Sequence, residues 1–156
     1  MATPSLVAQK EAQMKLLIVC RHGDYGSDGH LNDKGRAQFL LLAQLMTEEV
    51  GNRSARILSS TATRAMDGAK ILAEKLGIED IEGEGLLRDE IPMAKSDTVV
   101  EKIAALLKSR GADVEVLIVV THFDQVGYLH RFFNVPLGAD VERGHAVIVS
   151  FERLGR

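Results

Sequence analysis

The sequence contains little of several residue types, and each scarcity argues against a class of protein. Its 156 residues include one cysteine and no tryptophan, and only 4% of them are aromatic. A single cysteine can form neither an intramolecular disulfide nor a cysteine-based metal cluster, and few aromatic rings leave little surface for stacking nucleic-acid bases. The net charge of −3 gives no reason to expect binding to nucleic acid or to a membrane surface.

Long apolar runs are also lacking. No segment approaches the roughly 18 apolar residues of a membrane span. Residues 1–14 have neither a basic start nor an apolar run of about 7–15 residues, so they do not resemble a secretory signal. We therefore predict an N-terminal extension over residues 1–14, one domain over residues 15–156, and a cytoplasmic location.

What the sequence does have is an alternation of strand-like and helix-like segments. Short apolar runs predict strands at residues 15–20, 55–60, 114–120 and 145–152, and a weak edge strand at 80–85. Apolar residues spaced by three or four predict helices that begin after Asn32, at Ser60 or Thr61, near Ser96 and near Val126. This order indicates a single three-layer α/β domain, with helices on both faces of a mostly parallel sheet.

Charged and polar side chains follow three of these strands. The first strand runs into Arg21 and His22, the second into a helix with Arg64 in its first turn, and the fourth into His122. Alone, such a histidine can be an ordinary loop residue and such an arginine a solvated one. Reactive groups of parallel sheets, however, gather beyond the carboxyl ends of the strands, and an arginine at a helix N-terminus is favourable beside an anion. The four residues together predict a phosphate site.

The residue types also suggest the chemistry. With an ordinary pKa of about 6.5, a histidine is largely uncharged at neutral pH and is then a nucleophile. We predict that His22 attacks phosphorus and forms a phosphohistidine, while Arg21, Arg64 and His122 hold the equatorial oxygens. The attacking nitrogen must be held in one tautomer, which predicts a hydrogen bond from the other ring nitrogen to a nearby carbonyl.

The ordered segments "RHG", "LNDKGRAQ", "SSTATRA" and "VVTH" resemble the histidine phosphatase (phosphoglycerate mutase-like) superfamily over roughly residues 16–151. The short chain is similar to the bacterial phosphohistidine phosphatases of that superfamily. The resemblance implies a phosphoglycerate mutase-like fold, His22 as the nucleophile, and a phosphate pocket of Arg21, Arg64 and His122. It adds Gly23 and the backbone N–H of Phe123 as substrate contacts, and it implies no metal and no other cofactor.

The general acid is left open between several carboxylates. The family's glutamate falls on Asp89 in "LLRDEIP", whose side chain is one methylene shorter, and Glu90 follows it. Asp24 and Asp124 lie beside the two key histidines and are further candidates, although a capping or supporting role suits them better.

Five other residues with reactive or charged side chains receive weaker assignments. Cys20 lies in a buried strand and is expected to be structural. His30 could contact substrate, His145 could approach the site, and Arg88 could bind an anion. His130 is expected to pack within a helix or lie on the surface.

These observations predict a metal-independent phosphatase for a phosphomonoester or a protein phosphohistidine. Phosphohistidine leaves as an imidazole and needs less help from an acid, and a short chain with little room for a lid suits a protein-borne phosphate. The expected partner is a phosphorylated small molecule or phosphoprotein, with no nucleic acid and no membrane. The alternatives are a cofactor-dependent phosphoglycerate mutase, which would need closure over the site, and a catalytically weak phosphate-binding or adaptor domain.

Overall fold

A five-stranded sheet forms the centre of the structure, a computed structural model that describes residues 14–88, 97–122 and 142–151, with only the backbone for 97–100. The strands are β1 (Leu16–Arg21), β2 (Ala55–Ser60), β3 (Ile81–Glu84), β4 (Val116–Thr121) and β5 (Ala146–Ser150). Their spatial order is β3-β2-β4-β1-β5. The first four are parallel, whereas β5 runs antiparallel to β1. The predicted mostly parallel sheet is therefore confirmed.

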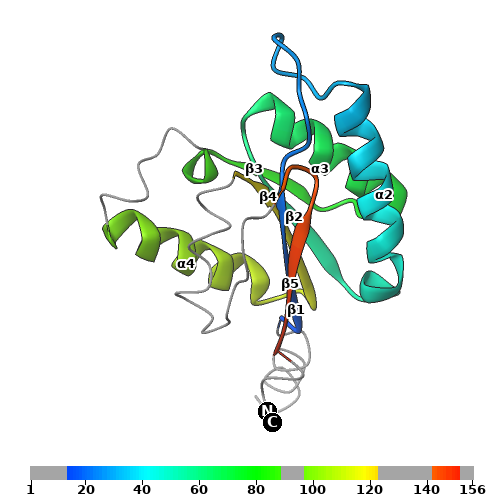
Figure 1. Ribbon diagram of the computed structural model, residues 1–156. Helices are drawn as coiled ribbons and strands as arrows, with labels where there is room; N and C mark the ends of the chain where they lie inside the picture. The colour runs from blue at the N-terminus through cyan, green and yellow to red at the C-terminus, as the bar shows by residue number, and fades with distance from the viewer. Residues whose placement is uncertain (1–13, 89–96, 123–141, 152–156) are drawn as a thin grey trace, which may run out of the picture.

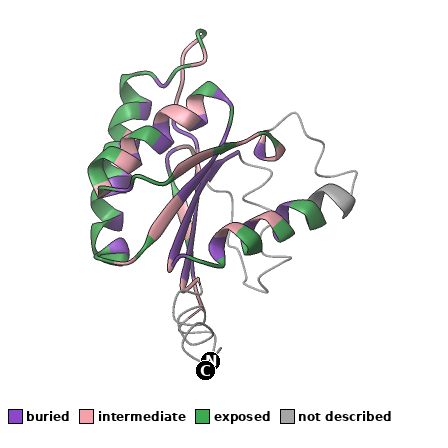
Figure 2. Cartoon of the chain, turned by 180° about the vertical axis from the view of Figure 1, so that it is seen from behind, coloured by how far each residue is buried: buried purple, intermediate pink, exposed green. Residues whose placement is uncertain are grey.

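Helices cover both faces of this sheet (Figure 1). The helices α2 (Asp33–Val50) and α3 (Thr63–Leu76) lie on one face and α4 (Asp97–Gly111) on the other. Successive side chains of β1 point to opposite faces, so that Ile18 packs under α2 and α3 while Val19 packs under α4. Covering both faces explains why β1 and β4 are almost continuously apolar and buried (Figure 2).

The helix ends agree with the sequence in two places and differ in one. The side chain of Asn32 caps α2 by accepting a hydrogen bond from the backbone N–H of Gly35, and Gly77 ends α3 in the left-handed conformation. The prediction that Ser60 or Thr61 caps α3 is wrong. The N-cap is Ala62, which has no side-chain hydrogen bond to the helix. Ser60 is the last residue of β2, and its hydroxyl forms a hydrogen bond with the ring of His122.

Two glycines allow elements to approach closely. A Cβ added to Gly68 of α3 would lie 2.7 Å from the ring of Phe39 on α2. A Cβ on Gly35, in the first turn of α2, would collide with the backbone carbonyl of Asp24. These contacts fix α2 against α3 and against the loop that follows β1.

Some expectations fall at or beyond the ends of the described ranges. Met14, which the sequence analysis assigns to the N-terminal extension, packs against the core under α4. The helix predicted near Val126 and the residue Ser96 lie outside the described residues. None of the helices in the described part of the chain combines the length and hydropathy of a membrane span.

Candidate active site

The carboxyl ends of β1, β2 and β4 bring two histidines together. The last residue of β1, Arg21, pairs in register with Thr121 of β4, and the N–H of His22 donates to the Thr121 carbonyl at 3.0 Å. The rings of His22 and His122 therefore lie with their centroids 5.2 Å apart, at an interplanar angle of 61°. Residues separated by a hundred positions in the sequence share one edge of the sheet.

His22 is buried and held in one tautomer. Its Nδ1 lies 3.0 Å from the carbonyl oxygen of Gly23. Because a carbonyl can only accept, Nδ1 carries the proton and the lone pair is on Nε2. Burial, together with the positive charges of Arg64, Arg21 and Arg143, lowers the pKa of His22 to about 4, against the opposing effect of the Gly23 hydrogen bond. The imidazole is therefore uncharged at neutral pH, with its reactive electron pair on a defined nitrogen.

Tyr25 connects His22 to two arginines, and sequence reasoning missed it. Its ring packs edge-on against His22 with the centroids 5.3 Å apart. The guanidinium of Arg64, from the first turn of α3, lies 4.8 Å from the centroid of the same ring, and that of Arg143 lies 5.0 Å from it. These cation–π contacts place the arginines close to His22.

Arg143 is the second residue that sequence reasoning missed. It lies in the turn before β5, where the N–H of Gly144 donates to the carbonyls of Arg21 at 3.2 Å and His22 at 3.0 Å. Because β5 is antiparallel, its amino end meets the carboxyl end of β1. The sequence does not fix the direction of that strand, so it carried no signal that would have revealed Arg143.

His122 is supported by the end of β2. Its Nε2 lies 2.9 Å from the hydroxyl oxygen of Ser60, which also accepts from the N–H of Ala62 at 3.2 Å. The neighbouring Thr121 donates its hydroxyl to the carbonyl of Leu87 at 3.0 Å. Ser60 and His122 are both buried, so the orientation of the His122 ring is fixed from two strands.

Of the four candidate acids, the structure describes Asp24 alone. Its carboxylate pairs with Lys34 at 3.1 Å and with Arg143 at 3.3 Å. The hydrogen bonds from Lys34 and from Arg143 lower the pKa of Asp24, against the opposing effect of burial. Asp24 is thus ionised at neutral pH and suited to hold Arg143 rather than to donate a proton. Asp89, Glu90 and Asp124 lie outside the described residues, as do Phe123 and His130.

Four of the residues with weaker assignments are described by the structure: Arg88, His30, His145 and Cys20. Arg88 donates to the hydroxyl of Thr61 at 3.1 Å, just beyond the end of β2. His30 pairs with Asp67 at 2.9 Å, and the His145 ring points to the carbonyl of Arg143 at 3.2 Å; both histidine side chains are more than half exposed. Cys20 is fully buried, and burial raises the pKa of its thiol, in keeping with a structural role.

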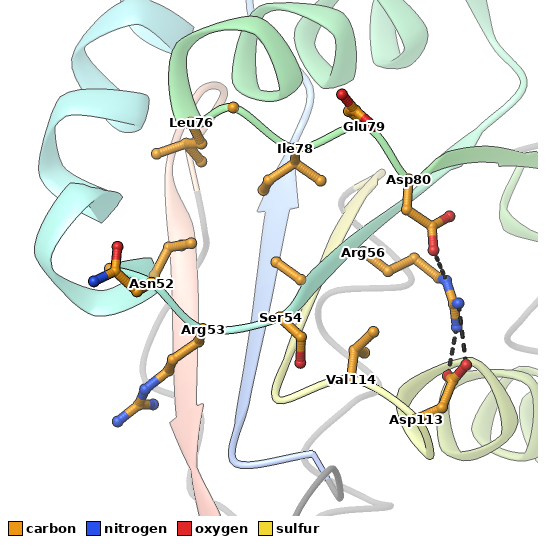
Figure 3. A pocket seen from close by; sticks show the side chains of 14 residues that line it. Asn52, Arg53, Ser54, Arg56, Leu76, Ile78, Glu79, Asp80, Asp113 and Val114 are labelled. Atoms are coloured by element: carbon orange, nitrogen blue, oxygen red, sulfur yellow. Dashed lines mark hydrogen bonds and ion pairs between the residues drawn. The ribbon is translucent and has the colours of Figure 1, made fainter.

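Two further observations concern the rest of the described chain. Within the described ranges, no group of three or more His, Cys, Asp or Glu side chains is arranged to hold a metal ion. An open depression of about 680 Å³ lies at the amino ends of the strands, opposite the histidines (Figure 3). Across it, Arg56 bonds with Asp80 at 2.8 Å and with Asp113 at 2.8 Å. This ion-pair cluster joins elements far from the candidate site.

Comparison with known proteins identifies a matching family model and similar structures. Residues 17–93 match the family model of the histidine phosphatase superfamily, branch 1, whereas no curated protein sequence matches the chain. A solved structure of the putative phosphohistidine phosphatase SixA from Agrobacterium tumefaciens superposes with a TM-score of 0.65 at 20% identity, covering 89% of this chain and 92% of its own.

Two other solved structures share the architecture. Mycobacterial glucosyl-3-phosphoglycerate phosphatase has a TM-score of 0.64 at 17% identity, covering 87% of this chain and 92% of its own. The phosphoglycerate mutase of Plasmodium falciparum has a TM-score of 0.59 at 19% identity, covering 80% of this chain and 72% of its own. These similarities show that the fold is phosphoglycerate mutase-like, as the sequence predicts.

Proposed function

We propose that the chain, whose residues 17–93 match the family model of the histidine phosphatase superfamily, is a phosphatase that hydrolyses a phosphomonoester or a protein phosphohistidine through a covalent intermediate on His22. The observation that carries the proposal is the hydrogen bond from His22 Nδ1 to the Gly23 carbonyl inside a buried, positively charged site. That bond leaves the lone pair on Nε2 of a ring held by its other nitrogen, which suits attack on phosphorus.

The reaction proceeds in two displacements. In the first, the Nε2 lone pair forms a bond to phosphorus while the P–O bond of an ester, or the P–N bond of phosphohistidine, breaks and its electron pair leaves with the departing group. In the second, water attacks phosphorus, the P–Nε2 bond breaks, phosphate departs and neutral His22 is restored. Arg21, Arg64 and His122 hold the phosphoryl oxygens, whose charge must be stabilised as the bonds exchange.

The departing group requires a proton when it is an alkoxide, and much less so when it is an imidazole. Asp89 and Glu90 are the proposed donors for an ester substrate. The ionised state of Asp24 supports this assignment by removing one competitor. A phosphohistidine substrate would tolerate the loss of either donor.

The first prediction tests the nucleophile. His22→Ala should reduce kcat/KM for a chromogenic aryl phosphate by at least about a thousandfold, since it removes the proposed acceptor of the phosphoryl group. It should also abolish the phosphohistidine trapped by rapid quenching. The matched control is His145→Ala, which removes an exposed imidazole and should stay within about threefold of the parent protein. Full activity in His22→Ala would overturn the assignment.

A substrate panel separates the remaining functions. Phosphohistidine proteins, sugar phosphates and phosphorylated serine or threonine peptides distinguish the two hydrolase substrates. Phosphoryl transfer between the hydroxyls of a phosphoglycerate, in excess over hydrolysis, would indicate a mutase. Binding of inorganic phosphate with no turnover of any substrate and no phosphoenzyme would indicate a binding or adaptor domain.

A further inference from the structure

Arg143 is fixed beside the phosphoryl pocket by three independent contacts. Its backbone turn is bonded to β1, because the N–H of Gly144 donates to the carbonyls of Arg21 and His22. Its guanidinium lies 5.0 Å from the centroid of the Tyr25 ring, and its Nη1 donates to Asp24 at 3.3 Å. A flexible surface arginine would not be held in this way, since ordering a long side chain costs conformational entropy.

The charge around Arg143 is not balanced by its partner. Asp24 contributes one negative charge, but it is shared with Lys34, whose Nζ lies 3.1 Å away. The three side chains together carry one net positive charge. Arg143 is also 42% exposed, so its guanidinium combines a fixed position with access for a ligand. A planar guanidinium with several N–H donors is well suited to a carboxylate or phosphate.

This residue lies next to the group that would react. Tyr25 contacts both residues: its ring centroid lies 5.3 Å from that of the His22 ring and 5.0 Å from Cζ of Arg143. The charge of Arg143 is near enough to contribute to the lowered pKa of His22. An anion bound by Arg143 would therefore lie close to a phosphoryl group bound at His22.

We propose that Arg143, held on Tyr25, forms a second anion subsite beside the phosphoryl pocket, and that the preferred substrates carry a second negatively charged group close to the phosphate. The inference rests on the proposed phosphatase function, because it extends the same site. The second anion can belong to a small phosphorylated acid or to an acidic side chain next to a phosphorylated residue; its chemistry is the same in both.

The test measures binding of phosphonates, which need no turnover. Phenylphosphonate and its 2-, 3- and 4-carboxy derivatives differ by one carboxylate at three distances from phosphorus. Isothermal titration calorimetry should show at least one carboxy derivative binding the parent protein about tenfold more tightly than phenylphosphonate. In Arg143→Gln this preference should fall to twofold or less, and in Arg143→Lys, which keeps the charge without the planar contact, it should be intermediate.

The matched control is Lys34→Gln. Lys34 pairs with the same carboxylate as Arg143 and its side chain is 75% exposed, so the variant removes an equal charge while leaving the Tyr25 contact intact. It should keep most of the preference for the carboxy derivative. Peptides with a stable phosphohistidine analogue next to Glu or Gln then show whether a protein can supply the second anion.

Two results would overturn the proposal. One is the absence of any preference for a carboxy derivative in the parent protein, and the other is a preference that survives in Arg143→Gln with an unchanged melting temperature. If only the proposed phosphatase function were wrong, the result would differ from both of these. Turnover would be absent, but the parent protein would still prefer a carboxy derivative and Arg143→Gln would still lose that preference.

Discussion

At the scale of single residues, burial makes the stability of the protein depend on the protonation of His22 in the same direction as on that of a salt-bridged carboxylate, because both have a lowered pKa in the folded state. Its pKa is about 4 in the folded protein and about 6.5 when unfolded. Between these values the unfolded chain binds more protons, so the free energy of unfolding falls as the pH is lowered from about 6.5 to 4. Above about 6.5 the contribution of His22 is complete, and it is on the order of 3 kcal/mol.

The corresponding prediction compares the protein with His22→Asn. Urea denaturation at several pH values should show a shallower decline in stability for His22→Asn, because the variant lacks the titrating group while the carboxylates remain. In the parent protein, the acidic limb of kcat/KM should lie near pH 4 instead of 6.5, because the proposed nucleophile is the neutral imidazole of His22. Parallel stability curves for the two proteins would show that His22 is not held neutral by the fold.

At the scale of secondary-structure elements, the packing of α2 against the loop after β1 depends on Gly35. A Cβ at this position would collide with the backbone carbonyl of Asp24, and a backbone group cannot rotate away. We expect Gly35→Ala to lower the free energy of unfolding by about 2–4 kcal/mol and to reduce kcat/KM by displacing Asp24 and its neighbour Gly23.

Gly85→Ala is the matched control for that change. Gly85 begins the 3₁₀ turn η1 (Gly85–Leu87), and an added Cβ there would meet nothing within 4 Å. Its free energy of unfolding should remain within about 0.5 kcal/mol of the parent protein in the same denaturant experiment. A Gly35→Ala variant as stable and as active as this control would contradict the close contact.

The elements also show what the sequence could predict and what it could not. Apolar runs located four of the described strands, the weak edge strand was expected near β3, and residue types at strand ends pointed to Arg21, His22, Arg64 and His122. The antiparallel direction of β5 was not predictable, because local periodicity identifies a strand without fixing its direction. Arg143 was missed for that reason.

The sequence also could not predict contacts of residues whose partners come from other elements of the fold. Ser60 was expected to cap α3, and only the position of His122 from another strand shows where its hydroxyl bonds. Tyr25 carries no motif of its own. Its role as the ring between His22 and two arginines depends on three elements meeting.

At the scale of the whole molecule, the ion-pair cluster around Arg56 and the candidate active site lie at opposite ends of the sheet. Arg56 joins the start of β2 to Asp80, Asp113 and the carbonyl of Arg110 at the end of α4. Its side chain is mostly buried, whereas its two carboxylate partners are half or more exposed. When the arginine is removed, water can therefore hydrogen-bond to the two carboxylates in its place and offset part of the lost interaction energy.

We expect Arg56→Met to lower the free energy of unfolding by about 2 kcal/mol, with kcat/KM unchanged within about twofold. Lys15→Met is the comparison, because it removes an exposed ion pair with Glu115 and should cost less than about 1 kcal/mol. Urea denaturation and an aryl phosphate assay on the same preparations measure both quantities. A fall in activity that follows the loss of stability in Arg56→Met would show that the two ends are coupled.

The arrangement of Arg21, Arg64 and Arg143 around an uncharged His22 has a consequence for the approach of substrates. The chain as a whole has a net charge of −3, so the edge that holds these arginines is a positive pole on a negative molecule. The net charge repels an approaching anion, whereas this positively charged edge attracts it, which favours encounters at the site. Added salt weakens this long-range guidance, because it acts through solvent, and has less effect on the contacts made once the phosphate is bound.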